Sequence, residues 1–139
     1  MSIFTLASLL AAATGGPIEH RVAVAHRGGE IAALYRADVE IATRNRGAVS
    51  PRGQGARQCH WTATLNITRR LEGAPQTERQ IGSERVLSGA RSGDCTAAAG
   101  AIRADIAARG ATVREQLIAA AEADRGVLVA ELEAAQPRG

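Results

Sequence analysis

Lysine is absent from this chain, and aromatic residues are nearly so. Of its 139 residues, 17 are basic, and every one of these is arginine. Aromatic residues make up 2% of the chain, namely Phe4, Tyr35 and Trp61. Alanine, valine, isoleucine and leucine must therefore fill the core. With 45% hydrophobic and 22% charged residues, the chain has the balance of a single folded domain.

The arginines outnumber the 14 acidic residues and give a net charge of +3. Arginine without lysine is typical of a GC-rich genome, which is our first interpretation. The alternative is a binding surface for nucleic acid or for an anionic envelope polymer. Such a surface needs arginines clustered on one face beside stacking aromatics. Acidic residues are interleaved with the arginines, so the pattern disfavours nucleic acid as a partner.

Sequence motifs for catalysis and metal binding are also missing. The chain has no Gly-x-Ser-x-Gly, no Ser-x-x-Lys and no glycine-rich phosphate loop before a helix. His20 and His26 lie six residues apart on one expected strand, about 20 Å, which is too far to share a metal. His60 has no carboxylate at a fixed spacing. We therefore expect no metal, no cofactor and no enzymatic activity, with a small hydrolase that uses His60 as an alternative.

The first residues lack charge and indicate a targeting segment. Residues 3–13 are apolar, too short to span a bilayer, and end in Ala11-x-Ala13, the small-residue pattern of a signal-peptidase site. No arginine precedes them, so a buried N-terminal helix is the alternative. We expect a signal peptide over 1–13, a linker over 14–17, and one domain over 18–136 in a periplasmic or secreted protein.

The two cysteines, Cys59 and Cys95, are most simply paired in an exported chain. Their bridge would close a loop of roughly 36 residues and stabilise the fold by about 3–4 kcal/mol. A metal site is the alternative, but no histidine stands at ligand spacing from them.

Alternating apolar and polar residues predict three clear strands and one short strand: 18–27, 30–44, 58–68 and 81–88. The third places Cys59 and Trp61 on its apolar face. Between the second and third, 45–56 is rich in glycine and predicts a mobile loop. A polar connection over 69–80 then leads to the short strand.

Gly28-Gly29 predicts a tight hairpin between the first two strands, because glycine readily adopts the positive φ angles that the turn needs. Pairing Arg27 with Glu30 sets apolar residues opposite apolar residues, for example Ile18 opposite Val39. The same register sets like charges opposite each other, Arg21 against Arg36 and Glu19 against Asp38.

The apolar period changes to that of a helix after Asp94, a candidate N-cap. Cys95 lies on the apolar stripe of this helix, so both sulfurs point to one core. Gly110 breaks the helix, and Thr112–Glu115 matches a capping box for a second helix that ends near Ala135. Its apolar seam over 118–135 is expected to pack within the chain, with a homodimer through 118–135 as the alternative.

Together these patterns predict an α+β fold, a three- or four-stranded antiparallel sheet with two C-terminal helices packed on one face and one disulfide. The expected core consists of Tyr35, Trp61, Leu65, Ile67, Ile102 and Ile106. The leading hypothesis is a non-catalytic exported interaction protein whose partner is another protein or an envelope component. Its candidate contact surface is the 45–56 loop or the polar face of the strands, with Arg36, Glu40, His60, Thr62 and Thr64.

The strand Cys59-x-Trp61, followed by Cys95 before an alanine-rich helix, resembles small uncharacterised exported proteins of GC-rich proteobacteria. The resemblance extends roughly from Tyr35 to Cys95. It implies export and assigns no activity.

Overall fold

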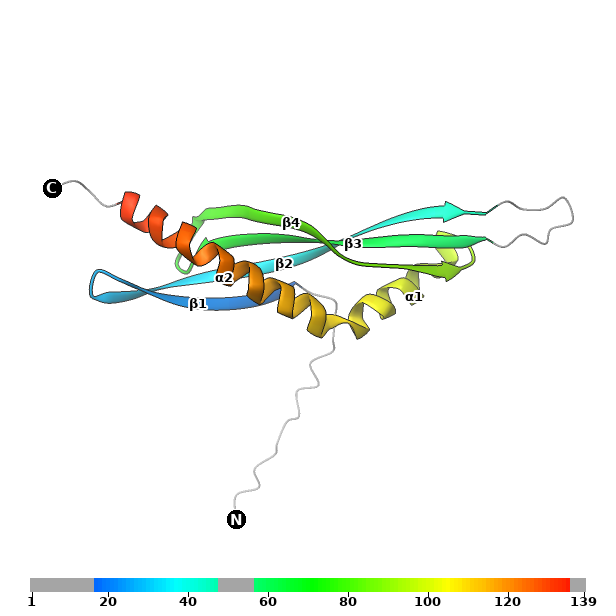
Figure 1. Cartoon of the computed structure of the whole chain (residues 1–139), viewed down its shortest axis with the longest axis horizontal. Coiled ribbons are helices and arrows are strands. Elements are labelled where there is room, and N and C mark those ends of the chain that lie inside the picture. Colours follow the sequence, from blue (N-terminus) through cyan, green and yellow to red (C-terminus); the bar gives the residue numbers. More distant parts are fainter. Residues whose placement is uncertain (1–16, 48–56, 136–139) are drawn as a thin grey trace, which may run out of the picture.

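The computed structural model describes residues 17–47 and 57–135 (Figure 1). The expected signal peptide over 1–13 lies outside these residues. So do 14–16 of the linker and 48–56 of the expected loop.

The fold is a four-stranded antiparallel sheet followed by two helices, as the α+β prediction requires. The strands lie in sequence order, so each is joined to its neighbour by a hairpin-type connection. Their bounds are β1 Ile18–His26, β2 Gly29–Arg46, β3 Gln58–Leu71 and β4 Ala74–Ser92. Figure 1 shows that β1 accompanies only part of β2, while β2, β3 and β4 continue together as a long, twisted sheet.

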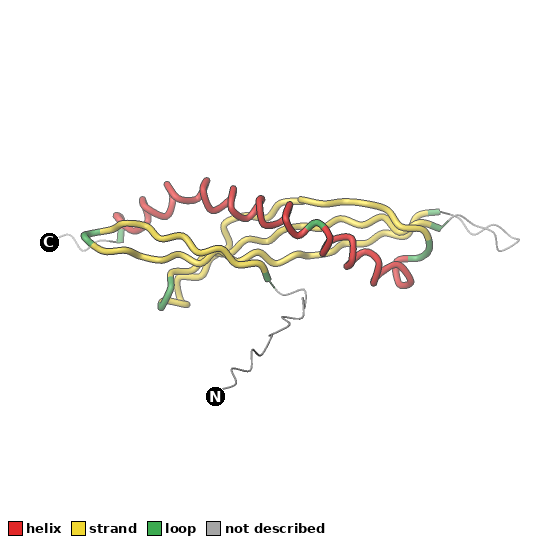
Figure 2. The backbone as a smooth tube through the Cα atoms, turned by 90° about the horizontal axis from the view of Figure 1, so that it is seen from below, coloured by secondary structure: helices red, strands yellow, loops and turns green. Residues whose placement is uncertain are grey.

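Helices α1 (Cys95–Ala108) and α2 (Gly110–Ala134) run one after the other along the same face of the sheet (Figure 2). The side chain of Asp94 accepts a hydrogen bond from the Ala97 N–H at 2.8 Å, which confirms Asp94 as the N-cap of α1. The predicted capping box is wrong. Helix α2 begins at Gly110 and has no side-chain cap, because Arg109 ends one helix and starts the next, and this leaves Thr112 within the first turn.

The first hairpin turns one residue earlier than predicted. Its turn residues are Arg27 and Gly28, with φ angles of 51° and 75°, so an arginine takes the left-handed conformation that we had assigned to Gly29. The register therefore shifts by two residues, which keeps every side chain on its predicted face. Glu19 now lies opposite Arg36, and the like-charge pairs of the predicted register disappear.

The polar connection predicted over 69–80 is strand instead. β3 continues to Leu71, Glu72 and Gly73 form the turn, and β4 spans 19 residues. Three register irregularities interrupt the pairing of β3 with β4. Because each irregularity breaks the two-residue alternation, β4 does not show the pattern by which strands are recognised in sequence.

The core lies between the sheet and the helices. The predicted core residues Tyr35, Trp61, Leu65, Ile67 and Ile102 are buried, and Ile106 is partly buried. Helix α2 contributes the residues that it turns toward the sheet: Val113, Leu117, Ala121 and Leu128. The expected packing of this helix within the chain is confirmed, and its inward stripe is used by its own sheet, while Ile118 remains 36% exposed.

Candidate functional site

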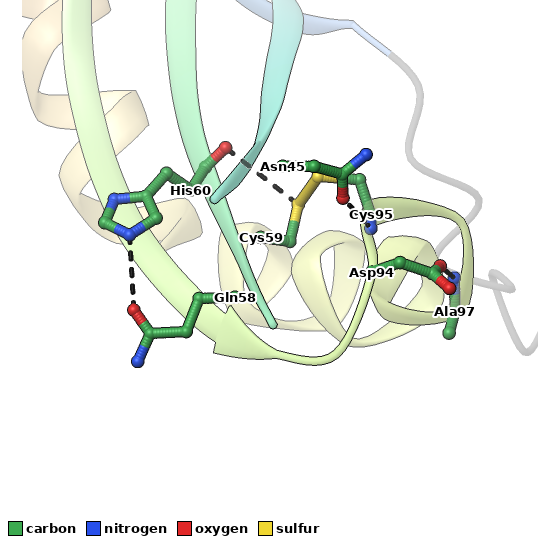
Figure 3. The surroundings of a disulfide bond; sticks show 7 residues. All are labelled: Asn45, Gln58, Cys59, His60, Asp94, Cys95 and Ala97. Atoms are coloured by element: carbon green, nitrogen blue, oxygen red, sulfur yellow. Dashed lines mark hydrogen bonds between the residues drawn. A yellow bond between two sulfur atoms is a disulfide. The ribbon is translucent and has the colours of Figure 1, made fainter. Parts of the chain in front are cut away.

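The disulfide Cys59–Cys95 joins β3 to the first residue of α1, with the two Cα atoms 4.8 Å apart (Figure 3). Beside it, the Asn45 side-chain oxygen accepts a hydrogen bond from the Cys95 N–H at 2.8 Å. This N–H belongs to the first turn of the helix and has no partner within the helix. Three elements, β2, β3 and α1, are thus fastened at one end of the sheet.

The face of the sheet opposite the helices is polar and open. Alternation along β2 and β3 places on it all the residues of the predicted contact surface: Arg36, Glu40, His60, Thr62 and Thr64. Glu40 accepts a hydrogen bond from the Asn66 side chain at 3.2 Å, and Ser83 donates to the other end of the same amide at 2.9 Å. The structure therefore brings the predicted residues to one face, spread along its length.

A shallow depression of about 630 Å³ lies at the disulfide end of this open face. Its floor is made of small side chains, from neighbouring positions of β2, β3 and β4: Ala42, Thr62, Ser88 and Ala90. Its rim carries the long basic side chains of Arg44, Arg46 and Arg85, together with His60. No helix residue lines it. We call this feature the basic depression.

The three arginines of the basic depression make no ion pair within the described part of the chain. On the helix side of the sheet, by contrast, Arg91 forms an ion pair with Asp105. That pair lowers the pKa of the Asp105 carboxyl, first through the hydrogen bond from Arg91. The basic depression is therefore a local excess of positive charge. This excess of charge is not visible in the sequence, because arginines and acidic residues alternate along the chain. In addition, Arg85 belongs to β4, whose full length the sequence pattern does not predict.

His60 has a neutral neighbour. Its Nε2 lies 3.3 Å from the side-chain oxygen of Gln58, two residues away on the same face (Figure 3). No carboxylate bonds to it in residues 17–47 and 57–135, so the acid partner that the hydrolase hypothesis requires is missing there. Those same residues also hold no cluster of three metal-binding side chains.

A buried ionic cluster that the sequence did not reveal joins α2 to the sheet. Arg69, only 3% exposed, donates hydrogen bonds to Asp124 and to Glu131, and the Tyr35 hydroxyl donates to Asp124 at 2.8 Å. Arg79 on β4 pairs with the other oxygen of Glu131. Position 69 continues the alternation by which odd-numbered residues of β3 point to the core, and this alternation is the sequence signal for a buried Arg69. Because the residue is an arginine, the sequence analysis assigns it to a polar connection instead.

The cluster changes the proton affinity of its members. Burial, and then the hydrogen bond to Asp124, raises the pKa of the Tyr35 hydroxyl above its ordinary value. Burial lowers the pKa of Arg69, but the hydrogen bond and charge of Asp124 outweigh it and leave that pKa raised. Perturbed groups often mark active sites. Here Tyr35 is fully enclosed and Arg69 nearly so, while Glu131 and Arg79 are partly exposed, and the ion pairs fasten the helix to the sheet.

Comparison with protein-family models, with curated proteins and with solved structures finds no match for this chain. Among the described residues, no helix combines the length and the apolar character needed to cross a membrane.

Proposed function

We propose that this is a non-catalytic binding protein, periplasmic or secreted, that holds an anionic envelope partner on the open face of its sheet. The observation that carries the proposal is the basic depression, where three arginines that pair with no carboxylate of the described residues surround a floor of small side chains. Arginine recognises phosphate and carboxylate groups through its planar fork of N–H donors. Thr62 and Ser88 on the floor add hydroxyl groups that donate or accept hydrogen bonds.

Location outside the cytoplasm is supported by the disulfide and by the apolar segment over 3–13. Structural disulfides persist in oxidising compartments and are rare in the cytosol. In the Cys59–Cys95 bridge Cys59 is fully buried and Cys95 partly buried, and the bridge fastens β3 to α1. These features suit a small protein that must keep its fold in the cell envelope or beyond it.

The burial of the tyrosine and tryptophan rings favours an anionic polymer over nucleic acid. Single-stranded nucleic acids are usually held by bases that stack on aromatic rings. Tyr35 and Trp61 are 0% and 2% exposed, although Trp61 is among the residues that line the basic depression. The His60 imidazole is the lining ring that is not buried, so the depression offers mainly charge and hydrogen bonds, which suit phosphate or carboxylate groups of a polymer.

The test is binding of lipopolysaccharide, with a single-stranded oligonucleotide as the comparison probe, measured by calorimetry at low and at physiological salt. We expect lipopolysaccharide to bind more tightly than the oligonucleotide, and Arg85→Ala to weaken its binding several-fold and to make it less dependent on salt. Arg125→Ala is the matched control, because it removes the same charge from an exposed position on α2. Equal losses in the two variants, or no binding by the native protein, would overturn the proposal.

A further inference from the structure

The edge of β2 is unpaired over half of its length. β1 pairs with β2 only as far as Ala37, which lies opposite Ile18. From Asp38 to Arg46, β2 bonds to β3 on one side and to no strand of the described chain on the other. Figure 1 shows this half of β2 continuing past the end of β1. An exposed edge of nine residues is a template for another strand.

The backbone polar groups of this free edge follow from the strand's geometry. The Glu72 N–H donates to the Ala32 oxygen at 2.8 Å, so even-numbered residues of β2 direct their backbone groups toward β3. Neither pairing of β2 with its neighbours is interrupted before Arg46, so the alternation holds throughout. Four residues therefore present their N–H and C=O groups to the free edge: Val39, Ile41, Thr43 and Asn45.

The side chains of this edge are charged in a self-complementary order. On the open face the sequence runs Asp38, Glu40, Ala42, Arg44, Arg46, acidic on one side of Ala42 and basic on the other. A second copy that lies antiparallel about a two-fold axis at Ala42 sets Asp38 opposite its Arg46, and Glu40 opposite its Arg44. Centring the pair on Ile41 or on Thr43 loses both of these pairs and forms a single opposite-charge pair in their place, Asp38 with Arg44 or Glu40 with Arg46.

The length of the free edge of β2 places the two-fold axis at the same residue, Ala42. The free stretch begins after Ala37, where Ile18 blocks further pairing, and it ends at Arg46, before Gly47 turns the chain with a φ of 104°. The middle of the nine residues is Ala42. Ile41, 38% exposed, lines an apolar groove beside α1 and would lie against a residue of the second strand.

We infer that two copies of this chain associate through β2 in an antiparallel pair centred on Ala42, which joins their sheets into one of eight strands. Opposite residues of even number form the non-hydrogen-bonded pairs, in which side chains lie closest, so both charge pairs have favourable geometry. In this pair Arg44 and Arg46 form ion pairs with the second copy, so the three arginines of the basic depression are free of such partners only in the single copy, and Arg85 with His60 remains in each basic depression of the pair. The inference does not depend on the proposed function.

Charge reversal tests the pairing, with association measured by analytical ultracentrifugation. Glu40→Arg and Arg44→Glu each set like charges together at two places in the symmetric pair, so each should raise the dissociation constant at least tenfold. The double variant Glu40→Arg/Arg44→Glu restores opposite charges and should recover native association. Arg70→Glu, exposed on the same face but on β3, is the control that should leave association unchanged. All three positions are exposed, so folding of the four variants is checked simply by circular dichroism.

A cysteine at the axis tests the register. Ala42→Cys should form an intermolecular disulfide, because the two copies of this residue face each other within the 4.4–6.8 Å that a disulfide spans. Thr62→Cys on the neighbouring strand should not, since three strand spacings, about 14 Å, separate its copies. A monomeric native protein would overturn the inference, and so would charge-swap variants that do not rescue each other. Slow amide exchange at Ile41 and Thr43 in a monomer would mean that another segment, such as residues 1–16, covers this edge.

Discussion

At the scale of single residues, Gly89 has a packing role that its neighbours in β4 lack. A Cβ atom added to Gly89 would lie 2.7 Å from a ring carbon of Trp61, because the indole rests against the β4 backbone. Trp61 is 2% exposed, so its ring is enclosed by neighbouring atoms of the core and has little room to move away from an added Cβ. The missing side chain at Gly89 is thus part of how the largest core residue fits.

We expect Gly89→Ala to destabilise the protein by about 1–3 kcal/mol, because overpacking a core forces side chains off their preferred rotamers. Gly82→Ala is the matched control. It also lies in β4, and a Cβ there meets no atom within 4 Å, so its unfolding free energy should stay close to native. Urea unfolding followed by the fluorescence of the single tryptophan measures both. Equal stability of the two variants would show that the ring has room beside Gly89.

Tyr35 provides a prediction about pH. Burial, and then the hydrogen bond to Asp124, raises the pKa of its hydroxyl above the ordinary 10.0. Below pH 10 both the folded and the unfolded chain keep this proton, so the contribution of Tyr35 to stability is complete. Above it the unfolded chain loses the proton while the folded chain retains it, so stability falls as pH rises.

Because Tyr35 is the only tyrosine, tyrosinate absorbance reports this group alone. In an alkaline titration we expect that absorbance to rise together with the loss of the helical circular dichroism signal. Tyr35→Phe should remove this part of the alkaline instability. Absorbance that rises near pH 10 while the helical signal is intact would contradict the burial and bonding described for Tyr35.

At the scale of elements, the ionic cluster decides how α2 is fastened to the sheet. Removing one member of a buried ion pair leaves an uncompensated charge and costs about 3–5 kcal/mol. We expect a loss of this size for Arg69→Met, measured by chemical denaturation. Arg69→Met/Asp124→Leu should recover part of it, because the apolar pair carries no buried charge, and the recovery stays incomplete because the Tyr35 hydroxyl loses its acceptor.

Arg91→Met is the control for that prediction, since it breaks the exposed ion pair with Asp105 and should cause a far smaller loss. If Arg69→Met and Arg91→Met destabilised the protein equally, the cluster at Arg69 would have no special role in holding α2.

Elements with one apolar face were predictable from the sequence, and elements that break the pattern were not. The clean alternation of β3 and the stripe of α1 aimed Cys59 and Cys95 at the same core, and the bridge is confirmed. The length of β4 was missed because its register irregularities disturb the alternation. The apolar seam of α2 does not reveal that Asp124 faces inward, because this carboxylate is directed there by its ion pair with Arg69.

The sequence predicts which face of the sheet carries the candidate site, but it does not predict the basic depression on that face. Alternation alone placed His60 and Thr62 on the open face. The basic depression also needs Arg44, Arg46 and Arg85, which come together only through the pairing of β2 with β3 and of β3 with the unrecognised part of β4. Strand pairing brings together arginines that are separated by acidic residues along the chain, and a sequence pattern alone does not show which charges become neighbours.

At the scale of the whole molecule, the two faces of the sheet have different tasks. One face is covered by both helices and holds the disulfide, the ionic cluster and the core. The other is open, polar and locally basic, and the proposed function and the paired β2 edges both belong to that side. The covered face thus holds the interactions that stabilise the fold, and the open face holds the proposed binding site.

The most direct test of the proposed function is to map where an anionic partner touches the labelled protein, using amide chemical shifts during titration with lipopolysaccharide fragments. The account predicts that the shifts concentrate at the basic depression, on residues such as His60, Arg85 and Ser88, and vanish in Arg85→Ala. Shifts on the outer surface of α2, or changes spread evenly over all exposed arginines, would contradict it.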